Sequence, residues 1–364
     1  MTNERVIAMG MAAALCACRL SAQGPLTPPG APGVTMKTLQ QIEPRTPISS
    51  APYVITAPGA YYLTTNLVSA GHGIVVQAPN VTLDLMGFTV SGDGDSGDYG
   101  IYLQGSAETP LSGVAVCNGR VERFHFGLYA AYLSHSRLEA LQVTRNTAAG
   151  MLFSGVGGSA CSGNRITACT LSRNATFGLY VQCQSGGSIQ GNVIADCEMA
   201  DNSNVGLRLY NATGGSHGEN RVERCVLRNN LSSGIMMTAV SNTVIEACTV
   251  SGQAGRGIEM ELSNHNTVMG CLIVKNTGSA GILVSQGKGN RIEGNRVIDN
   301  GGQSDRGIWT SISEKNLIVR NICIGQASNY DLDTDDTYGP IVTDTGELSA
   351  GTAAAHPWAN FSRP

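Results

Sequence analysis

"NRVERCVLRNNLSSGI", Asn220 to Ile235, is the stretch that decides the fold. The same frame precedes it twice, as "NVIADCEMADNSNVGL" from Asn192 and "NRITACTLSRNATFGL" from Asn164, at steps of 28 residues. Each copy begins with Asn, carries Cys at the sixth place and Asn at the eleventh, and ends in Gly-Leu or Gly-Ile. A repeat of this period predicts a solenoid, in which each unit buries its apolar side only against its neighbours.

A glycine followed by an apolar residue recurs along the chain at steps of 23 to 28 residues. These glycines are Gly73, Gly100, Gly127, Gly150, Gly178, Gly206, Gly234, Gly257, Gly281 and Gly307. After the glycine, stretches such as "GLRLY" alternate, so that Leu207 and Leu209 point to one side and their neighbours to the other. No segment has a helical period. The pattern predicts an all-β coil with three short strands in each unit.

The chain from about Val54 to Leu332 resembles the right-handed parallel β-helix proteins, the pectin-lyase-like superfamily with its short parallel β-helix repeats. The resemblance rests on the "N-x-I/V…N…G-I/L" frame and on "NVTLDLMGFTVSG" from Asn80. It implies a single-stranded right-handed parallel β-helix of about ten rungs. Catalytic and non-catalytic proteins share this frame, so the resemblance says little about activity.

In such a coil, equivalent residues on successive rungs stack roughly 4.8 Å apart. The repeat therefore predicts three columns, two of asparagine and one of cysteine. The first contains Asn164, Asn192, Asn220, Asn266, Asn290 and Asn316, and the second contains Asn146, Asn174, Asn202, Asn230, Asn276 and Asn300. The third contains Cys169, Cys197, Cys225, Cys248 and Cys271 and continues into Asn295 and Asn321.

The cysteine column is expected to pack inward, where thiols behave as small apolar groups. A linear file of thiols offers no tetrahedral cage, so a metal site is not expected there. Cys161 and Cys183 lie in loops of adjacent rungs. They could form a disulfide or remain two separate thiols.

Composition narrows the function classes. The net charge of −4 gives no support to a nucleic-acid partner, and no apolar run is long enough for a membrane helix. Residues 1–22 resemble an export signal, although "LCAC" leaves lipid anchoring as an alternative. A secreted or cell-surface protein is expected.

The expected organisation after that signal has four parts. Residues 23–47 form a Pro/Gly-rich linker, 48–66 an N-terminal cap, 67–332 the β-helix, and 333–364 a tail that folds back on the coil.

The strand after each glycine is expected to present one exposed face. Tyr129, Tyr180, Tyr210 and Trp309 are the predicted substrate-binding residues on this face, because aromatic rings spaced by rungs suit sugar rings. Arg208 would bind a uronate or sulfate group. The alternative is an ordinary exposed sheet, since strands are enriched in aromatic residues.

Catalytic candidates on the same face are Glu259, Glu261 and Arg208. The two carboxylates would be ~6.5–7 Å apart along a strand, within the range for an inverting glycosidase, although any two same-face neighbours share that spacing. Resemblance to the pectate lyases implies a basic proton abstractor, for which Arg208, Arg221 and Arg291 are outward candidates, but no lyase signature is present. The aspartate pair implied by resemblance to polygalacturonases is also absent from this face.

Two acidic loops allow calcium as a cofactor or simply solvated turns. Asp93, Asp95 and Asp98 alternate in "SGDGDSGD", and a second group lies in "DLDTDD" from Asp331. Neither completes a calcium loop of the EF-hand type. His135, His217 and His265 are expected to be exposed turn residues.

The sequence therefore predicts an exported β-helix protein that binds or processes a polysaccharide, as a lyase or hydrolase if it is an enzyme. The alternative is a non-catalytic cell-surface or structural β-helix protein.

Overall fold

A computed structural model describes residues 43–94, 97–184, 186–301, 305–343 and 352–364, and residues 45–364 form one compact unit. The export signal predicted for residues 1–22 and most of the linker predicted for residues 23–47 lie outside the described residues. Within the described part, no helix is long and apolar enough to cross a membrane.

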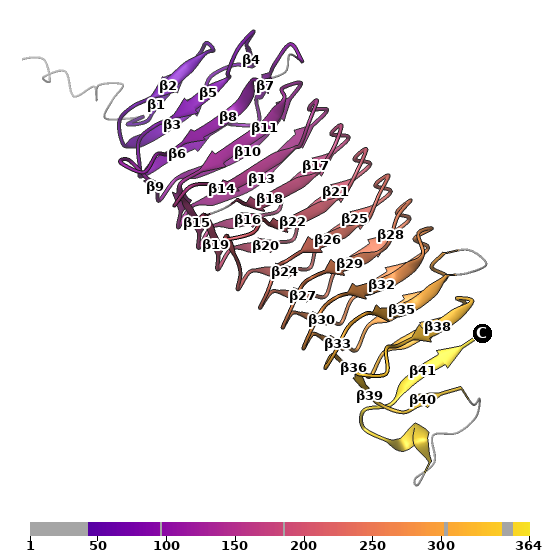
Figure 1. The fold of residues 1–364 in the computed structure, drawn as a ribbon. Coiled ribbons are helices and arrows are strands. Elements are labelled where there is room, and N and C mark those ends of the chain that lie inside the picture. The colour runs from indigo at the N-terminus through magenta and orange to yellow at the C-terminus, as the bar shows by residue number, and fades with distance from the viewer. Residues whose placement is uncertain (1–42, 95–96, 185, 302–304, 344–351) are drawn as a thin grey trace, which may run out of the picture. The chain divides into compact units, whose positions relative to one another are not determined.

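Parallel strands wind into the predicted right-handed coil, with about 10 turns and three strands to a rung (Figure 1). The first face is sheet B, which has 12 strands. Its strands are β2 (Tyr53–Ile55), β5 (Ile74–Val76), β8 (Tyr99–Gln104), β11 (Phe126–Ala131), β14 (Met151–Gly155), β18 (Leu179–Cys183), β22 (Leu207–Asn211), β26 (Ile235–Thr238), β29 (Ile258–Glu261), β32 (Ala280–Ser285), β35 (Arg306–Ser311) and β38 (Ser328–Asp331).

Sheet A has 24 strands and forms the other two faces as two ladders. The first ladder contains β1 (Thr46–Ile48), β3 (Gly59–Leu63), β6 (Val81–Asp84), β16 (Arg165–Thr167), β20 (Val193–Ala195), β24 (Arg221–Glu223), β27 (Val244–Glu246), β30 (Thr267–Met269), β33 (Arg291–Glu293), β36 (Leu317–Val319) and β39 (Thr337–Tyr338). The second contains β4 (Leu67–Val68), β7 (Thr89–Ser91), β17 (Thr170–Ser172), β21 (Glu198–Ala200), β25 (Val226–Arg228), β28 (Thr249–Ser251), β31 (Leu272–Val274), β34 (Arg296–Ile298), β37 (Ile322–Ile324), β40 (Ile341–Val342) and β41 (Asn360–Arg363). Two longer strands, β10 (Ala115–Glu122) and β13 (Arg137–Thr144), run through both ladders.

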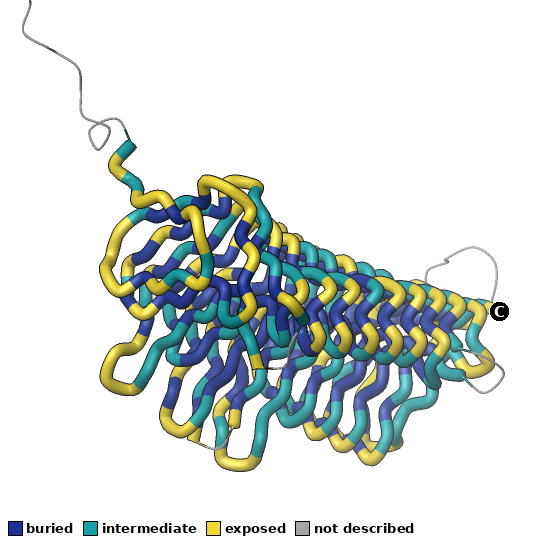
Figure 2. The backbone as a smooth tube through the Cα atoms, turned by 90° about the horizontal axis from the view of Figure 1, so that it is seen from above, coloured by how far each residue is buried: buried dark blue, intermediate teal, exposed yellow. Residues whose placement is uncertain are grey.

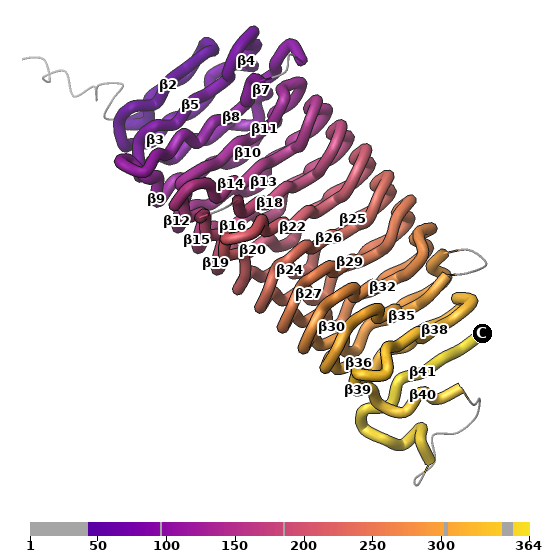
Figure 3. The backbone as a smooth tube through the Cα atoms, viewed as in Figure 1, coloured from indigo at the N-terminus to yellow at the C-terminus, as the bar shows by residue number. Residues whose placement is uncertain are grey.

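A short third sheet, sheet C, lies at the corner between sheets B and A. Its five strands are β9 (Leu111–Ser112), β12 (Leu133–Ser134), β15 (Ala160–Ser162), β19 (Ser188–Gln190) and β23 (Ser216–Gly218). Four of them, β9, β12, β15 and β19, are labelled along one edge of the coil in Figure 3. Beyond β23 this corner is held by isolated bridges, from Gly218 to Ser241 to Asn264. A 3-10 helix, η1 (Ala353–Ala355), lies in the tail.

At each corner of a rung, a residue in the left-handed backbone conformation changes the direction of the chain. In the rung of the opening stretch, Glu219, Arg224 and Asn229 have φ values of +57°, +51° and +55°. The residue directly after each of them belongs to one of the three predicted columns. A left-handed non-glycine residue costs ~1–2 kcal/mol, so these bends need compensation from their surroundings.

The asparagine columns supply that compensation. Asn202 donates its backbone N–H and its side-chain Nδ2 to Oδ1 of Asn230, at 3.0 and 2.9 Å, and Nδ2 also donates to the Leu171 carbonyl at 3.0 Å. Its own Oδ1 accepts the equivalent two bonds from Asn174. The second column is thus a continuous hydrogen-bond chain from Asn146 to Asn300, and the first contains two such runs, on either side of Thr243. The predicted asparagine ladders are confirmed.

Other residues occupy the column positions where asparagine is missing. Thr243 donates its backbone N–H to Asn266 in the first column, and Gln253 accepts from Asn230 in the second. The tail closes two columns at the end of the coil. Asp336 accepts from Asn316, and Asn360 accepts from Asn321, in both cases at 3.0 Å from the backbone nitrogen.

The cysteine column is buried inside the coil, and all five residues are at most 2% exposed. Each thiol donates to the carbonyl two residues earlier, as Cys225 does to Glu223 at 3.4 Å. Hydrogen bonds with the thiols of its neighbours Cys197 and Cys248, together with burial, raise the pKa of Cys225. The nine described cysteines are all free, Cys161 and Cys183 included, and burial raises the pKa of Cys161 to about 11.

The recurring glycine is required by close approach of neighbouring rungs. A Cβ added to Gly150 would lie 2.7 Å from the carbonyl oxygen of Gly178 and 2.8 Å from Nδ2 of Asn174. The apolar residues that follow these glycines are buried, and buried stretches of backbone recur from turn to turn of the coil (Figure 2). The glycine column therefore marks where the backbone passes closest to the next rung.

We expect the column thiols to be unreactive in the native protein. In a chain carrying Cys16→Ser and Cys18→Ser, the half-buried Cys117 should react first with a thiol reagent, and the eight buried cysteines should react only after unfolding. Mass spectrometry of the labelled protein measures this order. Labelling of Cys225 at the rate of Cys117 would contradict the buried column.

Replacement of one column asparagine should destabilise the coil strongly. Asn202→Ala removes the side-chain oxygen that accepts from Asn174 and leaves that buried N–H unpaired, so the free energy of unfolding should fall by roughly 3 kcal/mol. Asn204→Ala is the matched control in the same turn and should stay within about 0.5 kcal/mol. Urea unfolding measures both, and equal losses would contradict the hydrogen-bond argument.

Candidate functional site

The outer face of sheet B, called face B below, is the face predicted to carry function. Its central row follows the strand register from one rung to the next. The row contains Tyr102, Tyr129, Leu152, Tyr180, Arg208, Met236, Glu259, Leu283, Trp309 and Asp331. All five tyrosine, arginine and tryptophan residues predicted for binding therefore lie on this face, four of them in this row and Tyr210 beside it.

The aromatic residues near the N-terminal end of face B stack on one another. Tyr99 lies parallel to His72 at 4.9 Å between ring centroids and parallel to Tyr129 at 4.8 Å. Tyr102 meets Tyr129 edge-on at 5.4 Å. Tyr99 therefore covers one face of the Tyr129 ring, and the cluster contributes to the packing between neighbouring rungs. Sugar binding by Tyr129 stays a prediction.

Arg208 lies at the centre of face B, between Tyr180 on the preceding rung and Met236 on the following one. Its guanidinium carbon lies 5.5 Å from the centroid of the Tyr210 ring. Its Nη1 atom is buried and has no hydrogen-bond partner among the described residues. Burial lowers the pKa of Arg208, and the charges of Glu259 and Glu261 partly oppose this shift. No described carboxylate lies within 4 Å of the guanidinium.

The two glutamates differ in environment although they are neighbours on one strand. Glu259 was expected to be exposed, but it is only 8% exposed. Its carboxylate accepts from Arg256 at 2.7 Å and from the hydroxyl of Ser233 at 2.8 Å. Glu261 is half-buried on the same side of β29. The buried carboxylate is therefore held by partners from the adjacent row, which single-strand alternation does not reveal.

Three further expectations about face B need correction. Leu152 and Leu283 take outward positions but are only 4% and 5% exposed. Their register neighbours include Tyr180 and Glu259. Trp309 is half-buried under Arg306, whose guanidinium carbon lies 4.0 Å from its ring centroid.

Arg221 and Arg291 do point outward, but they lie on sheet A rather than on face B. Each forms ion pairs there, with Glu223 and Glu246 in one case and with Glu293 in the other. Arg208 is thus separated from the other two cations proposed for lyase chemistry.

Loops between sheets B and C form a feature that the sequence reasoning missed. Three of them contain Gly-Gly-Ser, at residues 157–159, 186–188 and 214–216, and the repeated motif was visible in the sequence. Their glycines stack from rung to rung, with Gly158 donating to Gly186 at 2.9 Å and Gly186 to Gly214 at 3.1 Å. These three stacked loops, called the Gly-Gly-Ser ridge below, directly follow β14, β18 and β22. They therefore lie at the end of the strands that carry Tyr180 and Arg208.

The acidic loops have partners inside the protein. Asp98 pairs with His72 at 3.2 Å, whereas Asp95 lies outside the described residues. In the second loop, Asp331 pairs with Arg306 and Asp336 ends the first asparagine column. The calcium site proposed for Asp93, Asp95 and Asp98 stays a prediction.

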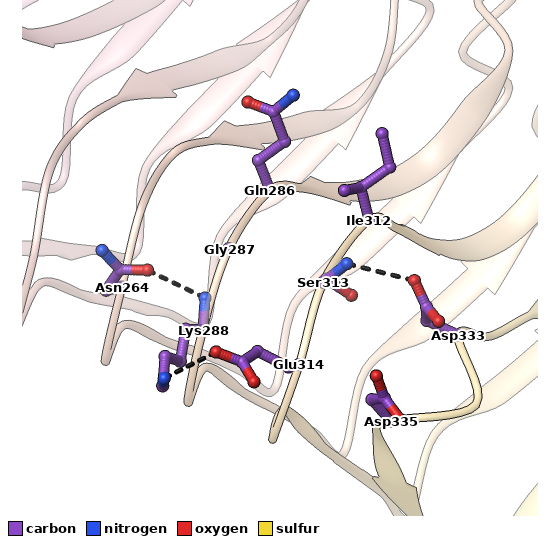
Figure 4. Close-up of a pocket in the computed structure, with 9 residues that line it drawn as sticks. All are labelled: Asn264, Gln286, Gly287, Lys288, Ile312, Ser313, Glu314, Asp333 and Asp335. Atoms are coloured by element: carbon purple, nitrogen blue, oxygen red, sulfur yellow. Dashed lines mark hydrogen bonds and ion pairs between the residues drawn. The ribbon is translucent and has the colours of Figure 1, made fainter.

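A pocket of about 460 Å³ opens near the second acidic loop (Figure 4). Lys288 pairs there with Glu314 at 2.5 Å, and Asp333 accepts from the backbone of Ser313 at 3.1 Å. Asp335 lines the same pocket, so its carboxylates outnumber its single cation. An acidic sugar would be repelled from this pocket.

The histidines divide into two environments. His135 and His265 are exposed, as predicted, but His217 is buried at 4% exposure and the expectation of an exposed turn is wrong. Burial lowers the pKa of His217 to about 4, so its imidazole is neutral at pH 7. It takes an inward position in sheet C, in register with Ile189 and Cys161.

Two family models match the chain. The model for a right-handed β-helix region matches residues 63–217, and the model for periplasmic copper-binding proteins of the NosD type matches residues 159–303 and 201–339. No curated protein sequence matches the chain.

Solved structures of similar fold share little sequence with the chain. A protein of Geobacillus virus E2, ORF18, has a TM-score of 0.59 and 13% identity over 72% of this chain and 53% of its own, so the chain spans about half of that protein. The A-module of a mannuronan C-5 epimerase from Azotobacter vinelandii has a TM-score of 0.59 and 16% identity over 84% of this chain and 91% of its own. A pectate lyase has a TM-score of 0.53 and 15% identity over 71% and 70%.

Replacement of the two glutamates by glutamine should separate their roles. Glu259→Gln removes the buried negative charge to which Arg256 and Ser233 donate hydrogen bonds. The free energy of unfolding should therefore fall by about 2 kcal/mol. Glu261→Gln, on the same strand, should stay within about 0.5 kcal/mol. Chemical unfolding measures both changes, and a neutral Glu259→Gln would show that its carboxylate does not depend on those partners.

Proposed function

We propose that this chain, which belongs to the right-handed parallel β-helix proteins of the pectin-lyase-like superfamily, binds an acidic polysaccharide on face B. The observation that carries the proposal is Arg208, a half-buried cation with no ion-pair partner among the described residues. Many other arginines of the coil are paired with carboxylates, as Arg221, Arg228 and Arg306 are. An anionic ligand would supply the missing charge-assisted hydrogen bonds.

The surroundings of Arg208 suit a polysaccharide. Tyr180 and Tyr210 lie on adjacent strands beside it, and their ring edges and hydroxyls can contact sugars. The Gly-Gly-Ser ridge borders the same rungs, so the ligand would lie against a wall rather than on a flat sheet. A chain along the coil axis would pass Tyr180 and Arg208 before it reaches Glu261.

Binding without turnover fits this geometry better than catalysis. Glycoside hydrolysis needs two available carboxylates, and Glu259 already accepts from Arg256 and Ser233. A lyase needs a deprotonated base, and although burial lowers the pKa of Arg208, a guanidinium normally keeps its proton in proteins. Glu261 is the half-buried carboxylate on β29 that could approach a sugar bound at Arg208.

A copper role does not fit the described residues. No group of three or more His, Cys, Asp or Glu among them is arranged to hold a metal ion. The column thiols lie in a single file within the core and donate to backbone carbonyls, as Cys225 does. Copper therefore does not enter the proposal. Export through residues 1–22 would place the protein where such polysaccharides occur.

Two of the similar folds are named for polyuronates, mannuronan and pectate, and these polymers are suitable probes. Arg208→Met should weaken binding to immobilised alginate or polygalacturonate by about 10- to 100-fold, since a charged hydrogen-bonding contact contributes ~1.5–3 kcal/mol. Arg208→Lys should keep part of the affinity. Binding of the parent should also weaken as salt is raised from low ionic strength.

Arg296→Met is the matched control, because Arg296 is an exposed arginine on sheet A. It should bind both polymers like the parent, which shows that overall charge is not the cause. Biolayer interferometry measures the affinities, and thermal melting checks that each variant is folded. Unchanged binding by a folded Arg208→Met variant would remove face B as the site.

A further inference from the structure

The Gly-Gly-Ser ridge ends abruptly beside Tyr210. The rung that starts at Gly206 is 28 residues long, whereas the rung that starts at Gly234 is 23 residues long. The missing residues are those of the loop, because the chain passes from β26 to Ser241 with no Gly-Gly-Ser segment. A polar recess of about 190 Å³ lies at this step.

The recess is lined mainly by neutral hydrogen-bonding groups. Among its lining residues are Gln190, Asn211, Ser216, His217, Glu219 and Asn242. Glu219 is the one carboxylate of the described lining, and no lysine or arginine takes part. The volume is below the ~300 Å³ of a pocket for a drug-sized ligand, so it suits a single small polar unit.

Two lining residues carry hydrogen-bond acceptors without donors. His217 Nδ1 lies 3.1 Å from the carbonyl oxygen of Tyr210, and a carbonyl can only accept, so Nδ1 holds the proton. Nε2 of the neutral ring is then an acceptor, and it is buried without a partner among the described residues. Oδ1 of Asn211 is in the same condition. An unpaired buried acceptor costs ~1–3 kcal/mol, which a ligand hydroxyl or an ordered water would recover.

The recess lies at the end of the strand that carries Arg208. Asn211, which lines it, is the last residue of β22, the strand of Arg208 and Tyr210. The stacked Gly-Gly-Ser loops follow β14, β18 and β22, and the chain after β26 has no such loop. A polymer on face B therefore has its first lateral opening at the recess.

We propose that this recess binds a neutral sugar unit of the same polysaccharide, a branch or the unit next to the acidic one at Arg208. The proposal rests on the proposed function of face B. Sugar hydroxyls would donate to the acceptors of Asn211 and His217, which line the recess at the rung without a Gly-Gly-Ser loop. They would also form hydrogen bonds with the amide and hydroxyl groups of the other lining residues. Glu219 and the lack of a lining cation disfavour a second uronate there.

The test compares polygalacturonate with the same backbone carrying neutral galactose branches. The parent should bind the branched polymer more tightly, by about tenfold if one or two hydroxyl contacts are gained. Ser241→Trp, which places a large side chain at the step, should abolish that preference and leave binding of the unbranched polymer unchanged. Lys288→Trp, in the equivalent turn two rungs on, is the matched control and should keep the preference.

The outcomes separate the two proposals. Loss of the preference in Ser241→Trp alone supports the recess, whereas a preference retained by a folded Ser241→Trp variant overturns it. A parent that binds both polymers equally also overturns it, and then the recess holds water only. Failure of Arg208→Met to weaken either polymer overturns the proposed function itself. If neither polymer binds the parent, both proposals fail.

Discussion

The structure depends on one repeated interaction, the hydrogen bond from a residue that follows a left-handed bend to the side-chain oxygen one rung along. The bend directs the next backbone N–H toward the adjacent rung, and the asparagine there accepts it together with the side-chain amide, as between Asn202 and Asn230. Each column residue also accepts from the rung before. A shift of one rung by one residue would break bonds on both sides, so the columns hold the register of all three faces together.

This fixed register explains why many outward side chains of face B contact one another instead of solvent. The bends place outward side chains of adjacent rungs close to one another, so rings stack on rings around Tyr99 and arginine packs on tryptophan at Trp309. Glu259 is likewise held by Arg256 and Ser233. Arg208 differs from these residues, because it lies between Tyr180 and Met236 on the flanking rungs and no described carboxylate lies within 4 Å of it. Glu259 and Glu261 act on its charge only at longer range.

The coil changes rung length without losing its columns. Between the 28-residue and 23-residue rungs the second asparagine column continues through Gln253, and the first resumes at Thr243, which donates to Asn266. The change in length is confined to the corner where sheet C ends, beyond Gly218. Loops at that corner can therefore vary with little effect on the core, which is consistent with the ridge and the recess lying there.

The sequence by itself determined the coil, the column residues and the alternation of inward and outward residues in the strands of sheets A and B. Spacing carries this information, because every rung repeats the same backbone geometry and the same inward positions, as Cys225 and Asn230 show. Only the tertiary structure decided what the outward residues do. Exposure of Glu259, Leu152 and His217 depends on side chains from neighbouring rungs and on the neighbouring faces of the coil, and strand alternation contains no information about those partners. For the same reason Arg208 could be proposed as a contact from sequence, but the absence of a described carboxylate within 4 Å of it could not.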